Sequence, residues 1–227
     1  MQFQDVMQQL EAAGSEQARK TYSRHGISGP MFGVSFAELK KLQKSIKKDQ
    51  GLALELWQTG NHDARVLATM IADPKALNDE IVDTWMQTIG YPSLAAQLAG
   101  LVAKSPLARP KADAWIGSEQ EYVSQAGWNI LAELALKDKT LTDQDFSPYL
   151  SQIEQDIHSR PNRTRYAMNG ALIAIGVRSP GLEQLALKAA AAIGNVAVDH
   201  GDTSCETPQA VAYIARTLAK KGYVVKG

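Results

Sequence analysis

The fold is decided first by an amphipathic stretch at residues 35–48, which reads SFAELKKLQKSIKK. Leu39, Leu42 and Ile46 recur in it at intervals of three and four residues, which gathers them on one face of a helix. Its first residue is a serine with a glutamate three positions later, the pattern of a capping box at a helix N-terminus. The stretch therefore predicts an α-helix whose apolar side packs against a core.

The same periodicity recurs along most of the chain, and strand-like alternation is nearly absent. Helix pairs repeat roughly every 35–45 residues, as in HEAT-like units, which stack because no pair buries its apolar face alone. We predict an all-α protein of about a dozen short helices, a HEAT-like helical-repeat solenoid (α-α superhelix) with a concave face, as one domain over residues 1–227. Pro106 and Pro110 mark a connection in this prediction. The clearest predicted helices are 35–48, 51–59, 62–72, 78–89, 93–104, 118–136 (with a capping box at its start), 143–158, 163–175, 181–193 and 208–221.

The composition is that of an ordinary globular protein, with 44% hydrophobic and 21% charged residues among 227. No apolar run reaches the roughly 18–20 residues that cross a bilayer, and the N-terminus lacks the features of a signal peptide. A single cysteine forms no internal disulfide, so we expect a cytoplasmic protein with no membrane contact. Because 24 basic residues balance 24 acidic ones, a nucleic-acid role requires cations gathered on one face.

An ordered series of short motifs resembles the AlkD-like HEAT-repeat DNA alkylation repair family. The motifs are residues 22–26 (YSRHG), 31–34 (MFGV), 39–42 (LKKL), 55–57 (ELW) and 62–68 (HDARVLA), with two tryptophans further on in the expected order. The resemblance covers most of the chain and implies an all-helical solenoid. It also implies a partner, duplex DNA that is alkylated or distorted, held in a basic concave groove.

The resemblance further implies a DNA glycosylase that removes N3- and N7-alkylated purines by stabilising a positively charged sugar. In that family a carboxylate, an arginine and two tryptophans line the site. The matching positions here are Tyr91 for the first tryptophan, Ala95 for the carboxylate, Gln125 for the arginine and Gly170 for the second tryptophan. A methyl group cannot stabilise an oxocarbenium-like charge, and a neutral amide cannot replace a guanidinium at a phosphate. The catalytic carboxylate is therefore missing from this pattern.

One candidate phosphate clamp is the start of the helix predicted at 163–175. Arg160, Arg163 and Arg165 precede or open it, with Asn169 one turn on from Arg165. The helix N-terminus itself attracts anions. The alternative is an ordinary solvated helix start.

Lysines form a second candidate, on the side of the 35–48 helix away from its leucines. Lys44 and Lys48 would track DNA phosphates together with Lys40, Lys41 and Lys47, which cover one broad face. The alternative is a solvated outer face, the default role of such lysines.

A third candidate is Arg24 with His25, which lead into a loop rich in glycine and proline. Such a loop can approach a nucleic acid closely. The alternative is a plain helix end at Gly26.

The polar segment 198–208 holds the only cysteine of the chain, and His200, Asp202 and Cys205 are its candidate catalytic residues. They have the N, O and S atoms of a metal site, and a His200–Cys205 thiolate pair is a further alternative. The third interpretation is a tight loop that caps a helix opening at 208, with Thr207 as N-cap. No P-loop, dinucleotide fingerprint or zinc-finger spacing is present, so we assign no cofactor and no metal.

The function predicted from these features is binding of damaged or distorted DNA on a concave face, with alkylpurine DNA glycosylase activity as a further expectation from the family. A non-catalytic scaffold for a protein or nucleic-acid partner and an enzyme centred on His200, Asp202 and Cys205 are the alternatives. The four tryptophans are predicted to lie in the core. Arg65 is expected to pair with an acid such as Asp63 or to face the groove.

Overall fold

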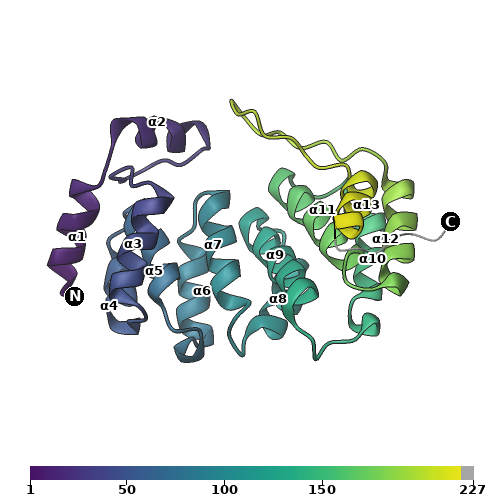
Figure 1. Ribbon diagram of the computed structural model, residues 1–227, viewed down its shortest axis with the longest axis horizontal. Helices are drawn as coiled ribbons and strands as arrows, with labels where there is room; N and C mark the ends of the chain where they lie inside the picture. Colours follow the sequence, from purple (N-terminus) through teal and green to yellow (C-terminus); the bar gives the residue numbers. More distant parts are fainter. Residues whose placement is uncertain (221–227) are drawn as a thin grey trace. The chain divides into compact units, whose positions relative to one another are not determined.

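The computed structural model describes residues 1–220, which form thirteen α-helices and two short 3-10 helices (Figure 1). β-type pairing in these residues is a single antiparallel bridge between Gly14 and Val34. The all-α prediction is therefore confirmed. The helices are α1 (Phe3–Ala12), α2 (Glu16–Arg24), α3 (Phe36–Ile46), α4 (Gln50–Gln58), α5 (His62–Ile71), η1 (Pro74–Ala76), α6 (Asp79–Gln87), α7 (Pro92–Val102), α8 (Ala108–Ile116), α9 (Glu121–Lys137), η2 (Asp143–Asp145), α10 (Ser147–Asp156), α11 (Asn162–Gly176), α12 (Pro180–Ile193) and α13 (Ala210–Lys220).

The chain divides into two compact units. The first comprises residues 1–107 with the short stretch His200–Ser204, and the second comprises Ala108–Asp199 with the described residues from Cys205 to Lys220. A single domain over residues 1–227 stays a prediction. No helix in the described part of the chain is long and apolar enough to cross a membrane.

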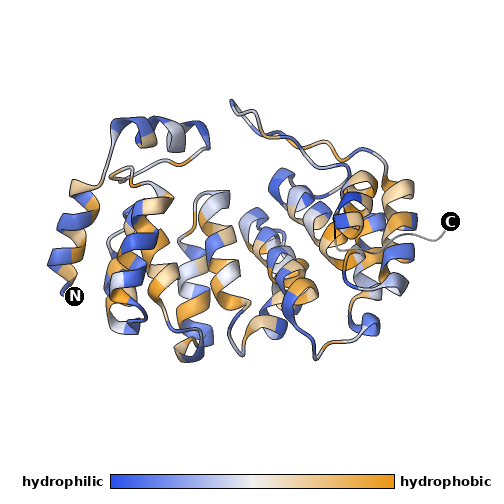
Figure 2. Cartoon of the chain, viewed as in Figure 1, coloured by the Kyte–Doolittle hydropathy of each residue, from blue (hydrophilic) through white to orange (hydrophobic). Residues whose placement is uncertain are grey.

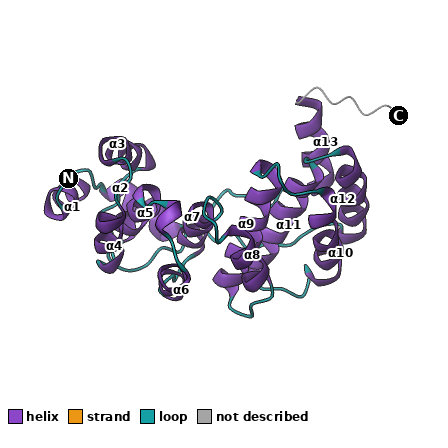
Figure 3. Ribbon diagram, turned by 90° about the horizontal axis from the view of Figure 1, so that it is seen from below, coloured by secondary structure: helices purple, strands orange, loops and turns teal. Residues whose placement is uncertain are grey.

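In the first unit, helices alternate between two layers. α5 packs between α3 and α7 in one layer, while α4 and α6 lie in the other, against α5 and α7 respectively (Figure 3). The side-chain cap of α5 is Asn61, whose Oδ1 accepts the N–H groups of Asp63 and Ala64 at the start of the helix predicted at 62–72.

The second unit repeats this arrangement. α9 lies between α8 and α11, and α11 in turn packs against α12 and α13 (Figure 3). A Cβ added at Gly127 of α9 would lie 2.6 Å from the backbone nitrogen of Ile116, so the two helices approach more closely than a side chain permits. Hydropathy follows burial: α2 is largely hydrophilic with no buried residue, whereas α12 has a broad apolar side (Figure 2).

Three details of the helix prediction are wrong. α8 occupies the connection marked by Pro106 and Pro110, because Pro110 stands in the first turn, where a missing N–H costs nothing. The capping box expected at Ser118 is absent, since Ser118 Oγ accepts the Gln120 N–H in a turn and α9 begins at Glu121. α1 and α2 were not among the predicted segments.

The tryptophan prediction is confirmed, because Trp57, Trp85, Trp115 and Trp128 are all at most 7% exposed. Trp57 and Trp85 stack in parallel with ring centroids 4.2 Å apart. Arg65 lies over Trp57 and donates hydrogen bonds of 3.1 Å to the carbonyls of Trp57 and Thr88. It therefore joins α5 to the ends of α4 and α6, and the expected pair with an acid is not formed.

Residues 194–209 connect α12 to α13 without a helix. The Asn162 side chain holds this connection through two 2.7 Å hydrogen bonds with the backbone of Asp199. Asn169 Nδ2 donates to the carbonyl of Pro208 at 2.9 Å. α13 begins only at Ala210, so Thr207 is not its N-cap, and residue 221 of the predicted helix lies outside the described residues.

Candidate nucleic-acid interface

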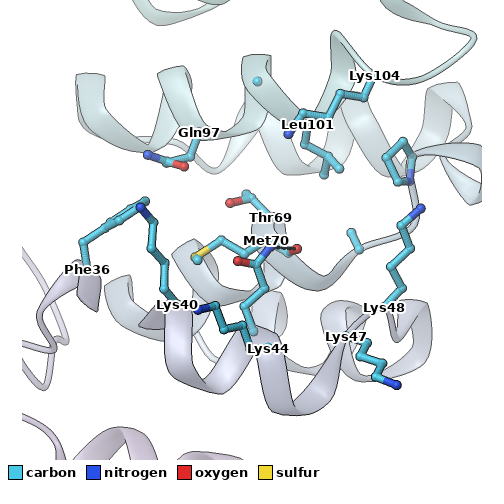
Figure 4. Close-up of a pocket in the computed structure, with 14 residues that line it drawn as sticks. Phe36, Lys40, Lys44, Lys47, Lys48, Thr69, Met70, Gln97, Leu101 and Lys104 are labelled. Carbon is cyan, nitrogen blue, oxygen red and sulfur yellow. Dashed lines mark hydrogen bonds between the residues drawn. The ribbon is translucent and has the colours of Figure 1, made fainter. Parts of the chain in front are cut away.

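Five lysines line a groove of about 550 Å³ in the first unit (Figure 4). Neither aspartate nor glutamate is among the residues that line it. α3 and the turn after it supply four of the lysines, and the turn after α7 supplies the fifth. We call this feature the lysine groove, and its cations are Lys40, Lys44, Lys47, Lys48 and Lys104.

The geometry of α3 explains why these lysines share one side. Lys40 and Lys44 recur at i and i+4 of the helix, while the buried Leu39 and Leu42 hold another side of it in the core. Ser35 Oγ accepts the Glu38 N–H, which fixes the start of the helix as the capping pattern predicts. All five groove lysines are exposed.

α5 and α7 form the floor and far wall of the groove. Thr69 and Met70 of α5 lie beneath the lysines, and Gln97 and Leu101 of α7 face them (Figure 4). Gln43 of α3 donates from Nε2 to the Met70 carbonyl at 3.0 Å, which ties the two helices together. The groove is therefore built by helices of a single layer, and a phosphate-tracking role for its exposed lysines stays a prediction.

The contacts of the groove lysines leave most of their charge available. Lys48 forms an exposed ion pair of 3.0 Å with Asp73, and this hydrogen bond lowers the pKa of the Asp73 carboxyl. Lys40 places its ammonium 5.4 Å from the centroid of Phe36. An exposed ion pair such as Lys48–Asp73 contributes little to the free energy of folding.

Two neighbouring lysines mark the limits of the groove. Lys41 lies on the other side of α3 and pairs with Glu38 at 2.6 Å. The prediction that all five lysines of residues 40–48 share one face is therefore wrong for Lys41.

Lys47 has φ 68 and ψ −121, which is a strained backbone for any residue but glycine. The chain keeps a lysine there nonetheless.

At the predicted phosphate clamp, Arg160 has a different role from the one expected. Its Nη2 donates to the carbonyl of Ser118 at 2.6 Å and to Ser124 Oγ at 3.2 Å, and its side chain is only 17% exposed. The exposed Glu119 carboxylate lies 3.4 Å away. The guanidinium thus closes the turn between α8 and α9.

The N-terminus of α11 also has an occupant. Glu121 Oε1 accepts the Arg163 N–H at 2.6 Å, so a carboxylate already stands where a phosphate was expected. Asn169 is 2% exposed and points away from solvent to Pro208, which excludes it from a surface contact. Arg163 and Arg165 are half-buried, and their role in DNA binding stays a prediction.

Arg24 and His25 are exposed at the end of α2. Gly26 has φ 78 and its N–H bonds to the Ser23 carbonyl, so the predicted helix end is confirmed. A nucleic-acid contact of Arg24 and His25 stays a prediction.

Within the 194–209 connection, His200 and Thr203 form a tight turn. Thr203 Oγ1 donates to the His200 carbonyl at 3.0 Å, and Gly201 has φ 61. Cys205 is exposed. Residues 1–220 contain no group of three His, Cys, Asp or Glu side chains that could hold a metal ion. A catalytic role for His200, Asp202 and Cys205 stays a prediction.

Three of the four positions that match the family's glycosylase site are buried, and the fourth is an exposed glycine. Tyr91 is 6% exposed and Ala95 is fully buried in α7. Gln125 is buried in α9, and Gly170 lies at the surface of α11 with open space where a side chain would be.

One buried polar cluster was not found from the sequence. The fully buried Asp63 carboxylate accepts the N–H groups of Phe32, Gly33 and Val34 at 2.7 to 3.0 Å. Beside it, His62 Nδ1 is 2.7 Å from the Tyr91 hydroxyl. Burial lowers the pKa of His62, although nearby Asp63 raises it, and burial raises the pKa of Tyr91 to about 12. His62 and Asp63 are the first two residues of the HDARVLA motif at residues 62–68. This motif was the signal in the sequence that pointed to the cluster.

The chain is similar to proteins of one family over most of its length. A family model described as DNA alkylation repair enzyme matches residues 6–214. The uncharacterized proteins Lin0241 of Listeria innocua and Lmo0209 of Listeria monocytogenes are 30% and 28% identical over 220 residues, which is 94% of this chain and 96% of each relative.

A solved structure gives the same fold. It is described as "a new family of proteins related to the HEAT-like repeat DNA glycosylases with affinity for branched DNA structures". It superposes with a TM-score of 0.90 at 33% identity, over 97% of this chain and 95% of that chain. The HEAT-like fold class predicted from the sequence is thereby confirmed.

Proposed function

Because the chain belongs to the family of DNA alkylation repair enzymes, we propose that it binds DNA and that the lysine groove holds the sugar-phosphate backbone. The observation that carries the proposal is five lysines on one groove with no acid in its lining. Lysine ammoniums bind phosphates as point charges without demanding one geometry. The groove concentrates positive charge for binding phosphate, although the whole chain has no net charge.

The preferred DNA in this proposal is branched or distorted rather than plain duplex. The similar solved structure belongs to a family whose description includes affinity for branched DNA. Arg163, Arg165, Arg24, His25 and the loop around His200 are the further contacts that we propose, on the concave side expected of a HEAT-like solenoid.

We propose recognition without base release. Tyr91, Ala95, Gln125 and Gly170 provide neither the carboxylate nor the guanidinium that the family's glycosylase chemistry uses. Ala95 is completely buried, so no solvent-facing group stands at the carboxylate position. A bound lesion would therefore keep its glycosidic bond.

The experiment compares the wild-type protein with a Lys40→Ala, Lys44→Ala, Lys104→Ala triple variant on plain duplex, N7-methylguanine duplex and a four-way junction. We expect the triple variant to bind the junction about tenfold or more weakly, and the slope of log K against log salt to fall by about 2 to 3. Lys41→Ala removes one positive charge from the other side of α3 and should leave both quantities unchanged.

Two results would contradict the proposal. An unchanged slope in the triple variant would mean that DNA does not contact the groove. Release of methylated base above the uncatalysed rate would remove the claim of recognition without chemistry.

A further inference from the structure

Phe36 is an unusual member of the lysine groove. It is the first residue of α3 and 43% exposed, whereas the equally large Phe146 is fully buried. It lines one end of the groove, beside Lys40 and near Gln97 of α7 (Figure 4). An exposed aromatic ring is thus placed among cations.

The backbone that carries the ring is held in place on its N-terminal side. The loop before it is held by Asp63, whose carboxylate takes the three successive N–H groups of Phe32, Gly33 and Val34. Ser35 then caps α3 directly before Phe36. A side chain at the first position of a capped helix, after a clamped loop, loses little further freedom when a ligand binds to it.

Its surroundings match a nucleotide rather than a protein side chain. The ammonium of Lys40 is 5.4 Å from the ring centroid, and Lys44 follows one turn later on the same side of the helix. The floor beside them is apolar at Met70 and Leu101. An exposed apolar ring with one cation over it and a second one helical turn along combines a stacking platform with phosphate contacts, the arrangement that binds single-stranded nucleic acid.

From this geometry, and resting on the proposed function, we infer that Phe36 stacks on an unpaired base of the DNA while Lys40 and Lys44 contact the adjoining phosphates. Both faces of a base in an intact duplex are covered by its stacked neighbours. An unpaired nucleotide, as at a gap, a flap or an open branch point, offers a free face that a base inside a duplex does not. The lysine groove would then select DNA with unpaired bases, and Phe36 would be the residue that makes the selection.

The test measures the affinity of the full-length protein for two junctions that differ only in two unpaired thymidines at the branch point. Wild-type protein should prefer the junction with unpaired bases, and Phe36→Ala should lose about tenfold in affinity for it while binding the fully paired junction as before. Phe36→Trp keeps a stacking ring and should retain the preference. Leu185→Ala removes another exposed apolar side chain, from α12 in the second unit, and serves as the control.

A second readout reports the stacking itself. 2-Aminopurine at the unpaired position should be quenched by wild-type protein and by Phe36→Trp, but not by Phe36→Ala. Equal loss on both junctions, or quenching that survives in Phe36→Ala, would overturn the inference. If Phe36→Ala behaves as wild type while the triple lysine variant loses affinity, the inference fails and the proposed function stands. Absence of binding to every DNA by wild-type protein would overturn the proposed function as well.

Discussion

Two positively charged stretches, one in each unit, have different fates in this molecule. The groove lysines remain exposed in a groove with no acid in its lining, whereas Arg160, just before α11, is bound by the protein. Arg160 donates hydrogen bonds to backbone carbonyls, and the Glu121 carboxylate accepts the Arg163 N–H at the N-terminus of α11. In the sequence the arginine cluster is the stronger phosphate clamp, because a helix N-terminus adds to its charge.

The difference teaches that side-chain chemistry decides which cations stay available. A guanidinium carries five donors in a rigid fork, so it readily satisfies several carbonyls at a turn between helices. An ammonium is strongly hydrated and stays in water on a flexible stem. Arg178 behaves as Arg160 does, donating to the carbonyls of Ala135 and Leu141. We therefore expect changes at Arg160 and Arg178 to affect stability and changes at the groove lysines to affect binding.

The largest effect expected from this comparison is the loss of stability in Arg160→Ala. The substitution removes the guanidinium that donates to the Ser118 carbonyl and to Ser124 Oγ, and this guanidinium is mostly shielded from solvent. We expect the free energy of unfolding to fall by about 3 kcal/mol, measured by urea denaturation. DNA affinity of the folded variant should be unchanged. A variant of normal stability that binds DNA poorly would mean that Arg160 contacts a DNA phosphate, as the sequence predicts.

A smaller effect is expected from Glu121→Ala, which sharpens the comparison at the helix end. Removing the carboxylate that accepts the Arg163 N–H should cost about 1.5 kcal/mol of stability, read from the same denaturation curves. It should also make the start of α11 free for an anion, so affinity for DNA should rise modestly at low salt.

Glu119→Ala is the matched control for this substitution. Its side chain is 91% exposed and reaches Arg160 only at 3.4 Å, so both stability and DNA affinity should stay near wild type. Equal gains in affinity from both variants would mean that overall charge, and not the helix end, is responsible.

The helices were predictable from the sequence because periodicity and capping are local. Leu39, Leu42 and the Asn61 cap needed only their neighbours in the chain. The site was predictable in part: Lys44 and Lys48 lie close together in the sequence, in α3 and the turn after it, but Lys104 joins them only through the packing of α7 against α5.

Partners far apart in the chain account for the rest. Asn169 was expected at the surface because it shares a face with Arg165, yet Pro208, 39 residues away, holds it inside. Glu121 lies 42 residues from the N–H group that it caps. Neither pairing leaves a periodic signal in the sequence, since both depend on which helices become neighbours.

The smallest expected effect concerns a titratable group that the first unit uses for packing. Burial holds the pKa of His62 below its usual value of 6.5, so the unfolded chain binds its proton more readily than the folded one does. Stability from this group is complete above about pH 6.5 and is lost as pH falls from there through the folded-state pKa. His62→Gln should flatten the dependence of the unfolding free energy on pH in that range, measured by urea denaturation at several pH values. His25→Gln, at an exposed position, is the control. An equally steep loss in both variants would place the acid sensitivity outside the cluster of His62, Asp63 and Tyr91.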